Sequence, residues 1–191
     1  MHEIVFYGRG GQGAVTAAQV LAEAAFLKGF YAQAFPKFGI ERRGAPVNAF
    51  ARISNEPIES RGIIKSADFA IVTDIMSVSP EVLFPSLKPS AAAILNSLLS
   101  TDELGGFKKK LQRSDVKIFA VDATEISEKV FGETPIPITS IAMVGAFAAA
   151  SALIDLDSIG EALATFFESK LAKKNLESAS LAFENLRRES S

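Results

Sequence analysis

The feature that most constrains the fold is the segment "GRGGQG" at residues 8–13. It lies between an apolar run, "EIVFY" at 3–7, and a stretch over 14–28 with apolar residues at helical spacings. A short apolar run without alternation is typical of a strand that is buried on both faces of a parallel sheet. Strand, glycine-rich turn and helix in this order predict the start of an α/β fold.

The following segments continue this pattern. "YAQAF" at 31–35 predicts a second strand, and residues 47–54 alternate apolar and polar side chains as a strand does. We interpret 40–64 as a β-hairpin insertion that leaves the parallel sheet, with "IESRGIIKS" as the returning strand; a loose loop is the alternative. Further strands are predicted at 68–74, 91–96 and 116–123, and further helices at 79–87, 124–132, 140–154, 158–168 and 171–187.

These elements predict one domain over residues 1–191. Its fold class is α/β: a doubly wound, mostly parallel sheet with a β-hairpin insertion and a helical carboxyl-terminal end. Asp122 and Ser79 are expected to begin the helices that follow them. Capping boxes are expected at Ser100 with Glu103 and at Ser158 with Glu161.

Composition excludes several classes of function. The chain has no cysteine, which excludes disulfides, a catalytic thiol and an iron–sulfur cluster held by cysteines of this chain. Its only histidine is His2, which excludes zinc sites built on several imidazoles. The formal net charge is -2 and basic residues are dispersed, so we expect no nucleic-acid partner. Without a secretory leader or a long apolar stretch, we expect a cytoplasmic protein with no membrane contact.

The glycine loop is the first candidate binding site. We expect Gly8 to permit a tight turn, Gly10 to let the backbone approach a ligand, and Gly13 to allow close packing of helix on strand. The first amides of the helix would then offer partial positive charge to an anion. The usual acidic residue of dinucleotide folds is missing after "YAQAF". A nicotinamide nucleotide, another anion and a purely structural turn all remain open. The candidate residues are Gly8, Gly10, Gly11, Gln12 and Gly13.

The second candidate is "FGIERRGAPVNAF" at 38–50, where charged residues stand among large apolar ones. Two adjacent arginines can bind a phosphate or carboxylate through paired guanidinium donors, and a neighbouring glutamate can orient them. A solvated charged loop is the alternative. The candidate residues are Glu41, Arg42, Arg43 and Gly44.

The remaining chemistry is sparse. Asp74 and Asn96 follow predicted strands, where either a ligand contact or a capping role is expected. The sequence has no nucleophile elbow, no P-loop lysine and no imidazole base. We therefore expect no catalytic residue and no metal ligand in this chain.

Together, "GRGGQGAVTAAQVLAEAA" and "FPKFGIERRGAPVNAFARIS" resemble the gamma subunit, or gamma domain, of 2-oxoacid:ferredoxin oxidoreductases. "SADFAIVTD", "AILNS" and "IAMVGAF" extend the resemblance over almost the whole chain, and the second motif favours the pyruvate branch. The resemblance implies an oxidoreductase complex that converts pyruvate and coenzyme A to acetyl-CoA and carbon dioxide and reduces ferredoxin.

The resemblance also implies the partners and cofactors. Alpha, beta and delta subunits would accompany this chain. Thiamine diphosphate with Mg²⁺ would lie between alpha and beta, and iron–sulfur clusters in delta and beta. The chain itself would hold none of these groups and would be inactive alone. The glycine loop and residues 41–43 would face the other subunits, near a phosphate of coenzyme A.

Other functions are also consistent with the sequence. The complex could act on another 2-oxoacid, such as 2-oxoisovalerate, through a shared gamma subunit. A free-standing NADP-binding protein is a second class, which predicts micromolar binding of a nucleotide by the isolated chain. A scaffold protein without complex-borne chemistry is a third.

Overall fold

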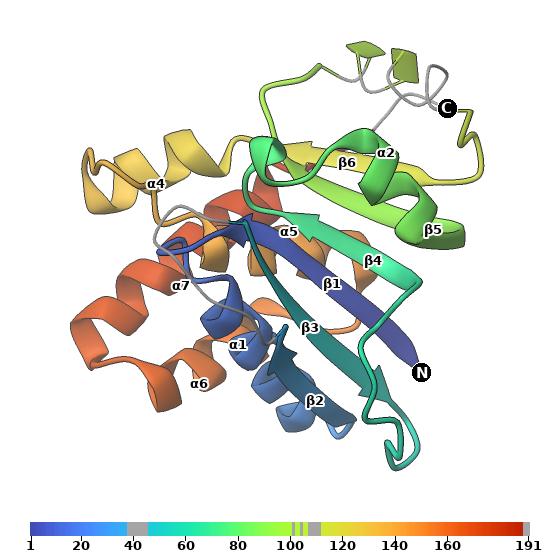
Figure 1. Ribbon diagram of the computed structural model, residues 1–191. Helices are drawn as coiled ribbons and strands as arrows, with labels where there is room; N and C mark the ends of the chain where they lie inside the picture. Colours follow the sequence, from blue (N-terminus) through green and yellow to red (C-terminus); the bar gives the residue numbers. More distant parts are fainter. Residues whose placement is uncertain (38–45, 101, 104, 107–111, 189–191) are drawn as a thin grey trace.

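The computed structural model describes residues 1–37, 46–100, 102–103, 105–106 and 112–188. Within these ranges seven strands form one sheet in the order β2-β3-β1-β4-β5-β6-β7 (Figure 1). The strands β1, β4, β5 and β6 are parallel neighbours, whereas β3 and β7 run antiparallel to the strands they pair with. The strands are β1 (His2–Arg9), β2 (Tyr31–Pro36), β3 (Pro46–Ser54), β4 (Ala67–Val72), β5 (Leu87–Asn96), β6 (Lys117–Val121) and β7 (Arg187–Arg188).

The predicted hairpin insertion is wrong in its placement. β3 does not leave the sheet: it lies inside it, paired antiparallel with β1 on one side and β2 on the other. Residues 58–66, expected to return as a partner strand, form no strand. The backbone of any strand can pair along two edges, and β3 uses both: Arg52 is opposite Glu3 of β1 and Gln33 of β2. The α/β class with a doubly wound sheet is confirmed, and its parallel part is the centre of the sheet.

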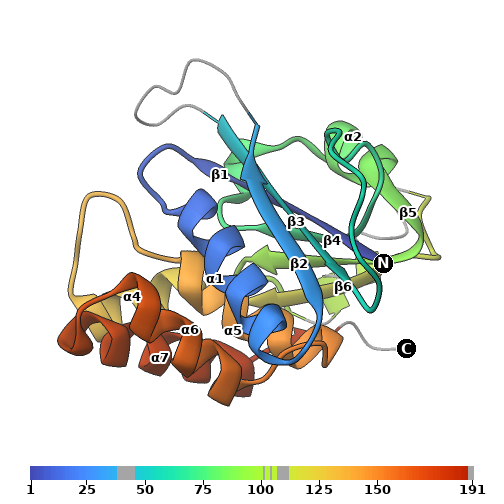
Figure 2. The ribbon, with the colours of Figure 1, turned by 90° about the horizontal axis from the view of Figure 1, so that it is seen from below.

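Helices cover the two faces of the sheet unequally (Figure 2). One apolar cluster packs the sheet against most of the helices and contains the fully buried Phe6, Leu21 and Phe147. The opposite face is covered by α2, η2 and the segment around Ile64, which pack on a second and smaller cluster. The helices are α1 (Ala14–Leu27), η1 (Ile75–Ser77), α2 (Pro80–Leu83), η2 (Phe84–Ser86), α4 (Ala123–Phe131), α5 (Ser140–Ser151), α6 (Leu156–Phe166) and α7 (Ser169–Glu184).

Capping side chains explain where several helices begin. Asp122 accepts a hydrogen bond from the Glu125 amide and starts α4, as predicted. Ser100 and Glu103 form the predicted capping box. The box predicted at Ser158 and Glu161 is wrong; in α6, Asp155 is the N-cap and Ser158 is its reciprocal partner, because the helix begins one turn earlier than expected. Ser79 stands at the N-cap of α2 without a side-chain hydrogen bond to it.

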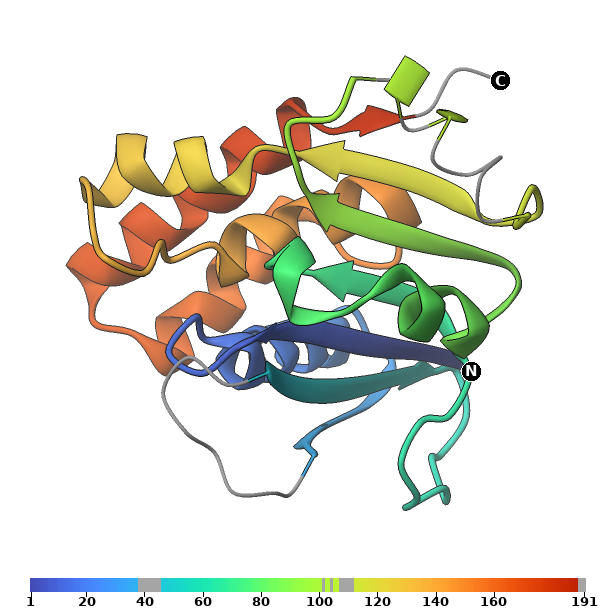
Figure 3. The same ribbon diagram turned by 45° about the horizontal axis from the view of Figure 1, so that its top comes forward.

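The carboxyl ends of the parallel strands meet at one edge of the sheet. The arrowheads of β1, β4, β5 and β6 point to the same side, where η1 and α4 lie (Figure 3). In such sheets ligands bind beyond the carboxyl ends of the strands. Both the glycine loop and the start of α4 are at this edge, which we call the carboxyl edge. Within the described ranges, no helix combines the length and apolar character needed to cross a membrane.

Candidate binding site at the carboxyl edge

The glycine loop connects the end of β1 to α1. Its turn needs two residues in the left-handed region, and glycine supplies both: φ is +97° at Gly11 and +81° at Gly13. Side chains with a Cβ adopt this region at a cost, so these two positions, rather than Gly8, make the turn.

Gly8 has a different role from the one predicted. It lies within β1, paired with Val47 of β3, and is buried. A Cβ on Gly8 would lie inside van der Waals contact distance of the Thr73 hydroxyl oxygen. Gly8 is therefore required for close packing of β1 beside the end of β4, and the prediction of a turn at this position is wrong.

Gln12 fills the loop with its own side chain. It is 7% exposed, and its Oε1 accepts a hydrogen bond from the Arg9 amide at 2.8 Å. The Thr73 hydroxyl lies 3.2 Å from the same oxygen and 3.1 Å from the Tyr7 carbonyl, which also accepts from the Thr73 amide. Buried polar groups are usually paired, and here Gln12 Oε1 and the Thr73 hydroxyl both have partners. Gln12 thus takes the Arg9 amide, which is not free for a ligand.

The amides at the start of α1 are the available donors. Gly13 is the N-cap of α1, which has no side-chain capping bond and no acidic residue in its first turn. The first turn of any helix has amides without an intrahelical partner, and the helix dipole adds positive potential there. A Cβ on Gly13 would lie 2.8 Å from Ser140 Oγ. Gly13 therefore allows close approach of α5, not of a strand as predicted.

A second uncapped helix begins at the same place. Thr139 is the N-cap of α5 and makes no side-chain capping bond, and the buried Ser140 that follows it is the residue nearest Gly13. The amino-terminal ends of α1 and α5 are therefore neighbours. Both dipoles favour negative charge at this end of the sheet.

Charge at the mouth of the loop is set by an ion pair. Arg9 Nε lies 2.7 Å from Asp74 Oδ2, with side-chain exposures of 41% and 21%. Asp74 Oδ1 also accepts a hydrogen bond from the Met76 amide at 2.8 Å. Asp74 therefore has two roles: it is the N-cap of η1, and it orients the Arg9 side chain. The ion pair uses Nε, and among the described residues no hydrogen bond or ion pair to the terminal nitrogens of Arg9 is seen, so these can reach an anion.

Asn96 connects the ends of β4 and β5 to α4. Its Nδ2 donates to the Thr73 carbonyl at 2.9 Å and to Thr124 Oγ1 at 3.1 Å, and its Oδ1 accepts from the Ala123 amide at 2.9 Å. These three hydrogen bonds make Asn96 a structural link between two strand ends and a helix at the carboxyl edge. The sequence identified Asp74 and Asn96 by their places after strands but missed Arg9 and Thr73. A threonine directly before Asp74 was the available signal for Thr73.

The second predicted site lies outside the described residues. This applies to Glu41, Arg42, Arg43 and Gly44, and also to the three lysines at 108–110. The segment joins the carboxyl end of β2 to the start of β3, whose first residue pairs with Arg9. Both attachment points are therefore at the carboxyl edge.

The sheet order argues against a dinucleotide site. In a dinucleotide fold the strand beside β1 is parallel, and an acidic residue at its end holds the ribose. Here the neighbour of β1 on that side is the antiparallel β3, and β2 is displaced by one strand. The described residues also contain no group of three or more His, Cys, Asp or Glu side chains placed to hold a metal ion.

The fold and the loop define a doubly wound α/β domain whose glycine loop is filled by a glutamine and whose uncapped helix start favours an anion. Comparison with known proteins identifies the family. The sequence profile of the family described as pyruvate ferredoxin/flavodoxin oxidoreductase matches residues 3–185. The chain belongs to this family.

Individual relatives match along nearly their whole length. The chain is 45% identical over 184 residues to the "Pyruvate/ketoisovalerate oxidoreductases common subunit gamma" of Pyrococcus furiosus, with 96% of each chain covered. It is 43% identical over 186 residues to the "Pyruvate synthase subunit PorC" of Methanothermobacter thermautotrophicus, covering 97% of this chain and 96% of that one. The crystal structure of pyruvate oxidoreductase subunit PORC from Thermotoga maritima superposes with a TM-score of 0.81 at 29% identity, covering 99% and 98%.

These comparisons confirm the resemblance predicted from the two motifs. The chain is a gamma-type subunit in a family of multi-subunit oxidoreductases, as the sequence predicted.

Proposed function

We propose that this chain, acting as one domain over 1–191, is the gamma subunit of a cytoplasmic pyruvate:ferredoxin oxidoreductase. The complex would convert pyruvate and coenzyme A to acetyl-CoA and carbon dioxide, and pass the two electrons released to ferredoxin. Support comes from relatives named as gamma or PorC subunits of pyruvate-oxidising enzymes. One of those names includes ketoisovalerate, so use of 2-oxoisovalerate through a shared subunit is the alternative substrate.

In this proposal alpha, beta and delta subunits hold the resident cofactors. Thiamine diphosphate, Mg²⁺ and iron–sulfur clusters do not fit the residues of this chain. It has no cysteine to ligate iron, and its described residues offer no cluster of carboxylate or imidazole ligands for Mg²⁺. The chain contributes binding and orientation, and no step of the chemistry is assigned to its side chains.

We further propose that the glycine loop binds a phosphate of coenzyme A, together with Glu41, Arg42, Arg43 and Gly44. The observation that carries this assignment is the uncapped start of α1 beside the uncapped start of α5, with Arg9 at its mouth. Two helix amino termini and a guanidinium favour a multiply charged anion. Coenzyme A is the phosphorylated substrate of the proposed reaction.

A carboxylate placed at the start of α1 tests this assignment. Thr16→Asp puts a negative charge in the first turn, where it competes with a bound phosphate but interacts favourably with the helix dipole. In the assembled complex we expect the KM for coenzyme A to rise about tenfold, equivalent to about 1.4 kcal/mol. The KM for pyruvate and the thermal stability of the chain should not fall.

Thr16→Val is the matched control, because it keeps the β-branched shape and adds no charge. It should leave the KM for coenzyme A within about twofold of the wild-type value, a difference of less than about 0.5 kcal/mol. An unchanged KM in Thr16→Asp, with assembly intact, would exclude phosphate binding at the start of α1.

The arginines outside the described residues need their own experiment. Arg42→Ala with Arg43→Ala should raise the KM for coenzyme A without loss of assembly, whereas Arg61→Ala, at an exposed position before β4, should not. Titration of the isolated chain with NADP distinguishes the proposed subunit from the alternative class, a free-standing NADP-binding protein. Micromolar binding, roughly -8 kcal/mol, would favour a free-standing nucleotide-binding protein.

A further inference from the structure

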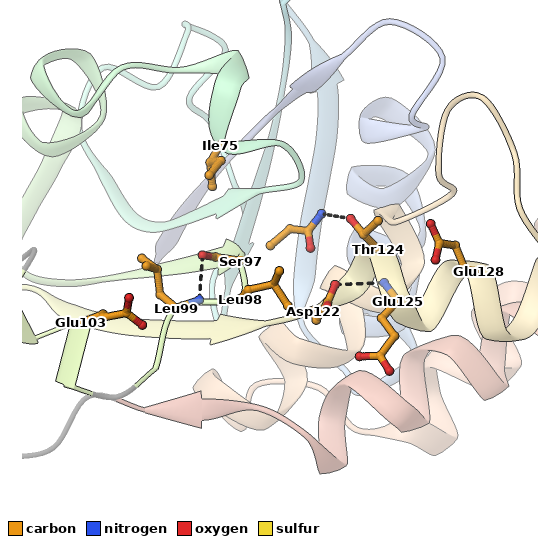
Figure 4. Close-up of a pocket in the computed structure, with 10 residues that line it drawn as sticks. Ile75, Ser97, Leu98, Leu99, Glu103, Asp122, Thr124, Glu125 and Glu128 are labelled. Atoms are coloured by element: carbon orange, nitrogen blue, oxygen red, sulfur yellow. Dashed lines mark hydrogen bonds between the residues drawn. The ribbon is translucent and has the colours of Figure 1, made fainter.

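A groove beside the candidate site is lined by apolar and acidic side chains (Figure 4). Its volume is about 640 Å³, and it lies between η1, the chain that leaves β5, and the first turns of α4. We call it the α4 groove. Its lining residues are Ile75, Asn96, Ser97, Leu98, Leu99, Glu103, Asp122, Thr124, Glu125 and Glu128.

Large apolar side chains are left in solvent at this groove. Leu98 is 76% exposed and Ile75 is 50% exposed, and Met76, next to Ile75 in η1, is 76% exposed. They come from two connections that follow neighbouring parallel strands, β4 and β5. Single exposed apolar residues are ordinary on protein surfaces, but several gathered around one groove mark an interaction site.

Hydrogen bonds hold Leu98 in this exposed position. Arg187 donates to the Ser97 carbonyl at 2.6 Å and to the Leu98 carbonyl at 3.1 Å. The Ser97 amide donates to the Val121 carbonyl, and Ser97 Oγ accepts from the Leu99 amide. The backbone on both sides of Leu98 is thus fixed before any partner binds, which lowers the entropic cost of association.

The same is true of Ile75 and Met76. Asp74 accepts from the Met76 amide, the Ser77 hydroxyl donates to the Asp74 carbonyl at 2.5 Å, and Arg9 is paired with the Asp74 carboxylate. These contacts fix η1 with both apolar side chains outward. The ion pair also connects η1, which lines the groove, to the glycine loop, because Arg9 ends β1 and Asp74 begins η1.

The described side chains that line the groove carry negative charge. Its described lining contains the carboxylates Glu103, Asp122, Glu125 and Glu128 and neither lysine nor arginine. Hydrogen bonds from the Ser100 amide and hydroxyl lower the pKa of Glu103. Within the described part of the chain, no ion pair joins the exposed Glu125 or Glu128 to a basic side chain.

Two basic residues of the described part of the chain line a second cavity next to the groove. Lys129 and Arg187 line a neighbouring cavity of about 550 Å³, which shares Leu98, Asp122 and Glu125 with the α4 groove. Arg187 is committed to the two carbonyls that it contacts. The groove itself thus presents apolar contact area surrounded by negative charge.

We propose that the α4 groove docks a segment of another subunit of the oxidoreductase that carries an apolar side chain flanked by lysine or arginine. The apolar side chain packs between Ile75 and Leu98, and the basic residues pair with Glu125 and Glu128. A second copy of this chain fits poorly, because two-fold contact through the same face would bring these carboxylates together. The same negative charge disfavours nucleic acid and anionic lipid.

This inference rests on the assembly part of the proposed function and is independent of coenzyme A binding. The first test is charge reversal in the co-expressed complex. Glu125→Lys with Glu128→Lys should weaken retention of the other subunits by about tenfold or more, as expected for charge reversal at a complementary surface. Wild-type retention should fall with rising salt, and the variant should lose that dependence.

Two control variants separate the groove from general effects. Glu161→Lys reverses one charge on the exposed surface of α6, which is half the charge change of the double variant, and Val82→Ser removes an exposed apolar side chain of α2. Both should retain the other subunits as the wild type does, whereas Leu98→Ser should not. Circular dichroism and melting temperature should be the same in all variants, since the mutated side chains are exposed.

Carbodiimide cross-linking of the wild-type complex identifies the occupant, because it joins carboxylates to lysines in direct contact. Cross-links from Glu125 or Glu128 to a lysine of a different subunit are expected. Cross-links to a second copy of this chain, or full retention by the charge-reversed variant, would overturn the inference and leave the proposed function intact. Absence of any oxidoreductase subunit from the wild-type preparation would overturn both.

Discussion

The two edges of the sheet differ in how their charged side chains are paired. At the amino edge, where the parallel strands begin, Arg52 is 3% exposed and pairs with Glu3, which also pairs with Lys88. Lys88 contacts Asp68 in turn, and the Glu3 amide donates to Asp68 at 2.7 Å. These charges are satisfied by one another.

At the carboxyl edge several charged or partly charged groups have no partner among the described residues. The ion pair of Arg9 and Asp74 is internal, but the start of α1 has no capping side chain, and Glu125 and Glu128 are exposed. Charges that a chain neutralises itself stabilise its fold, whereas charges left available favour a ligand or partner. We therefore expect substitutions at the amino edge to change stability and substitutions at the carboxyl edge to change binding.

The largest effect on stability is expected at Arg52. Its guanidinium donates to the Ser60 carbonyl at 3.2 Å and to the Gly62 carbonyl at 2.6 Å, and it lies over the Phe35 ring. Arg52→Ala leaves Glu3 without this partner and both carbonyls without a donor, so we expect a loss of about 3 kcal/mol in the free energy of unfolding. Denaturant unfolding of the isolated chain measures it.

The exposed Arg61 is the matched control, and Arg61→Ala should cost less than about 0.5 kcal/mol. The comparison between the edges fails if Arg52→Ala weakens retention of the other subunits at a temperature where the variant is folded.

A smaller loss of stability is expected from substitution of Gly8. This residue lies at the carboxyl edge, and its contribution to stability comes from close packing rather than from charge. Gly8→Ala forces its Cβ against Thr73 Oγ1, and overpacking of this kind costs about 2 kcal/mol. Thr73→Ala removes that oxygen, so the double variant should be less destabilised than the sum of the two single variants. A double-mutant cycle measures the difference, and strict additivity would show that the two positions do not share this contact.

The smallest effect is a pH dependence at the amino edge. Arg113 Nε donates a hydrogen bond to the Asp115 carboxylate at 2.9 Å. This hydrogen bond lowers the pKa of Asp115 from 3.8 to about 2. Because the folded pKa is below the unfolded one, the stabilisation is complete above about pH 4 and is lost as the pH falls toward 2. Asp115→Asn should lower the melting temperature slightly at neutral pH, and its difference from the wild type should vanish near pH 2. A constant difference over this range would exclude ionisation of Asp115 as the cause.

Local patterns in the sequence were sufficient to predict most elements. The glycine loop, the alternation over 47–54 and the cap at Asp122 depend on neighbours within a few residues, and the structure has all three. The order of the strands depends on pairing between distant segments, such as Glu3 with Arg52. Nothing local distinguishes a strand that joins β1 from one that forms a separate hairpin.

The site shows the same limit. The sequence located the loop, but it assigned Gly8 and Gly13 roles taken from dinucleotide folds. Their actual roles are set by Thr73 and Ser140, which are far along the chain and become neighbours only in the folded sheet. The α4 groove was not predicted at all, since its apolar and acidic side chains come from separate connections.

The position of β3 has a consequence for how the chain folds. Among the described strands, β2 pairs with β3 alone, so the first strand, helix and second strand cannot complete a sheet on their own. Pairing must wait until residues 46–54 are available, and it then joins β3 to a strand at the start of the chain, with pairs such as His2 and Ile53 that are far apart in the sequence. Such non-local closure slows folding. The amino-terminal third should therefore form late and as a unit, and emerging chains would carry an unpaired β1 until β3 arrives.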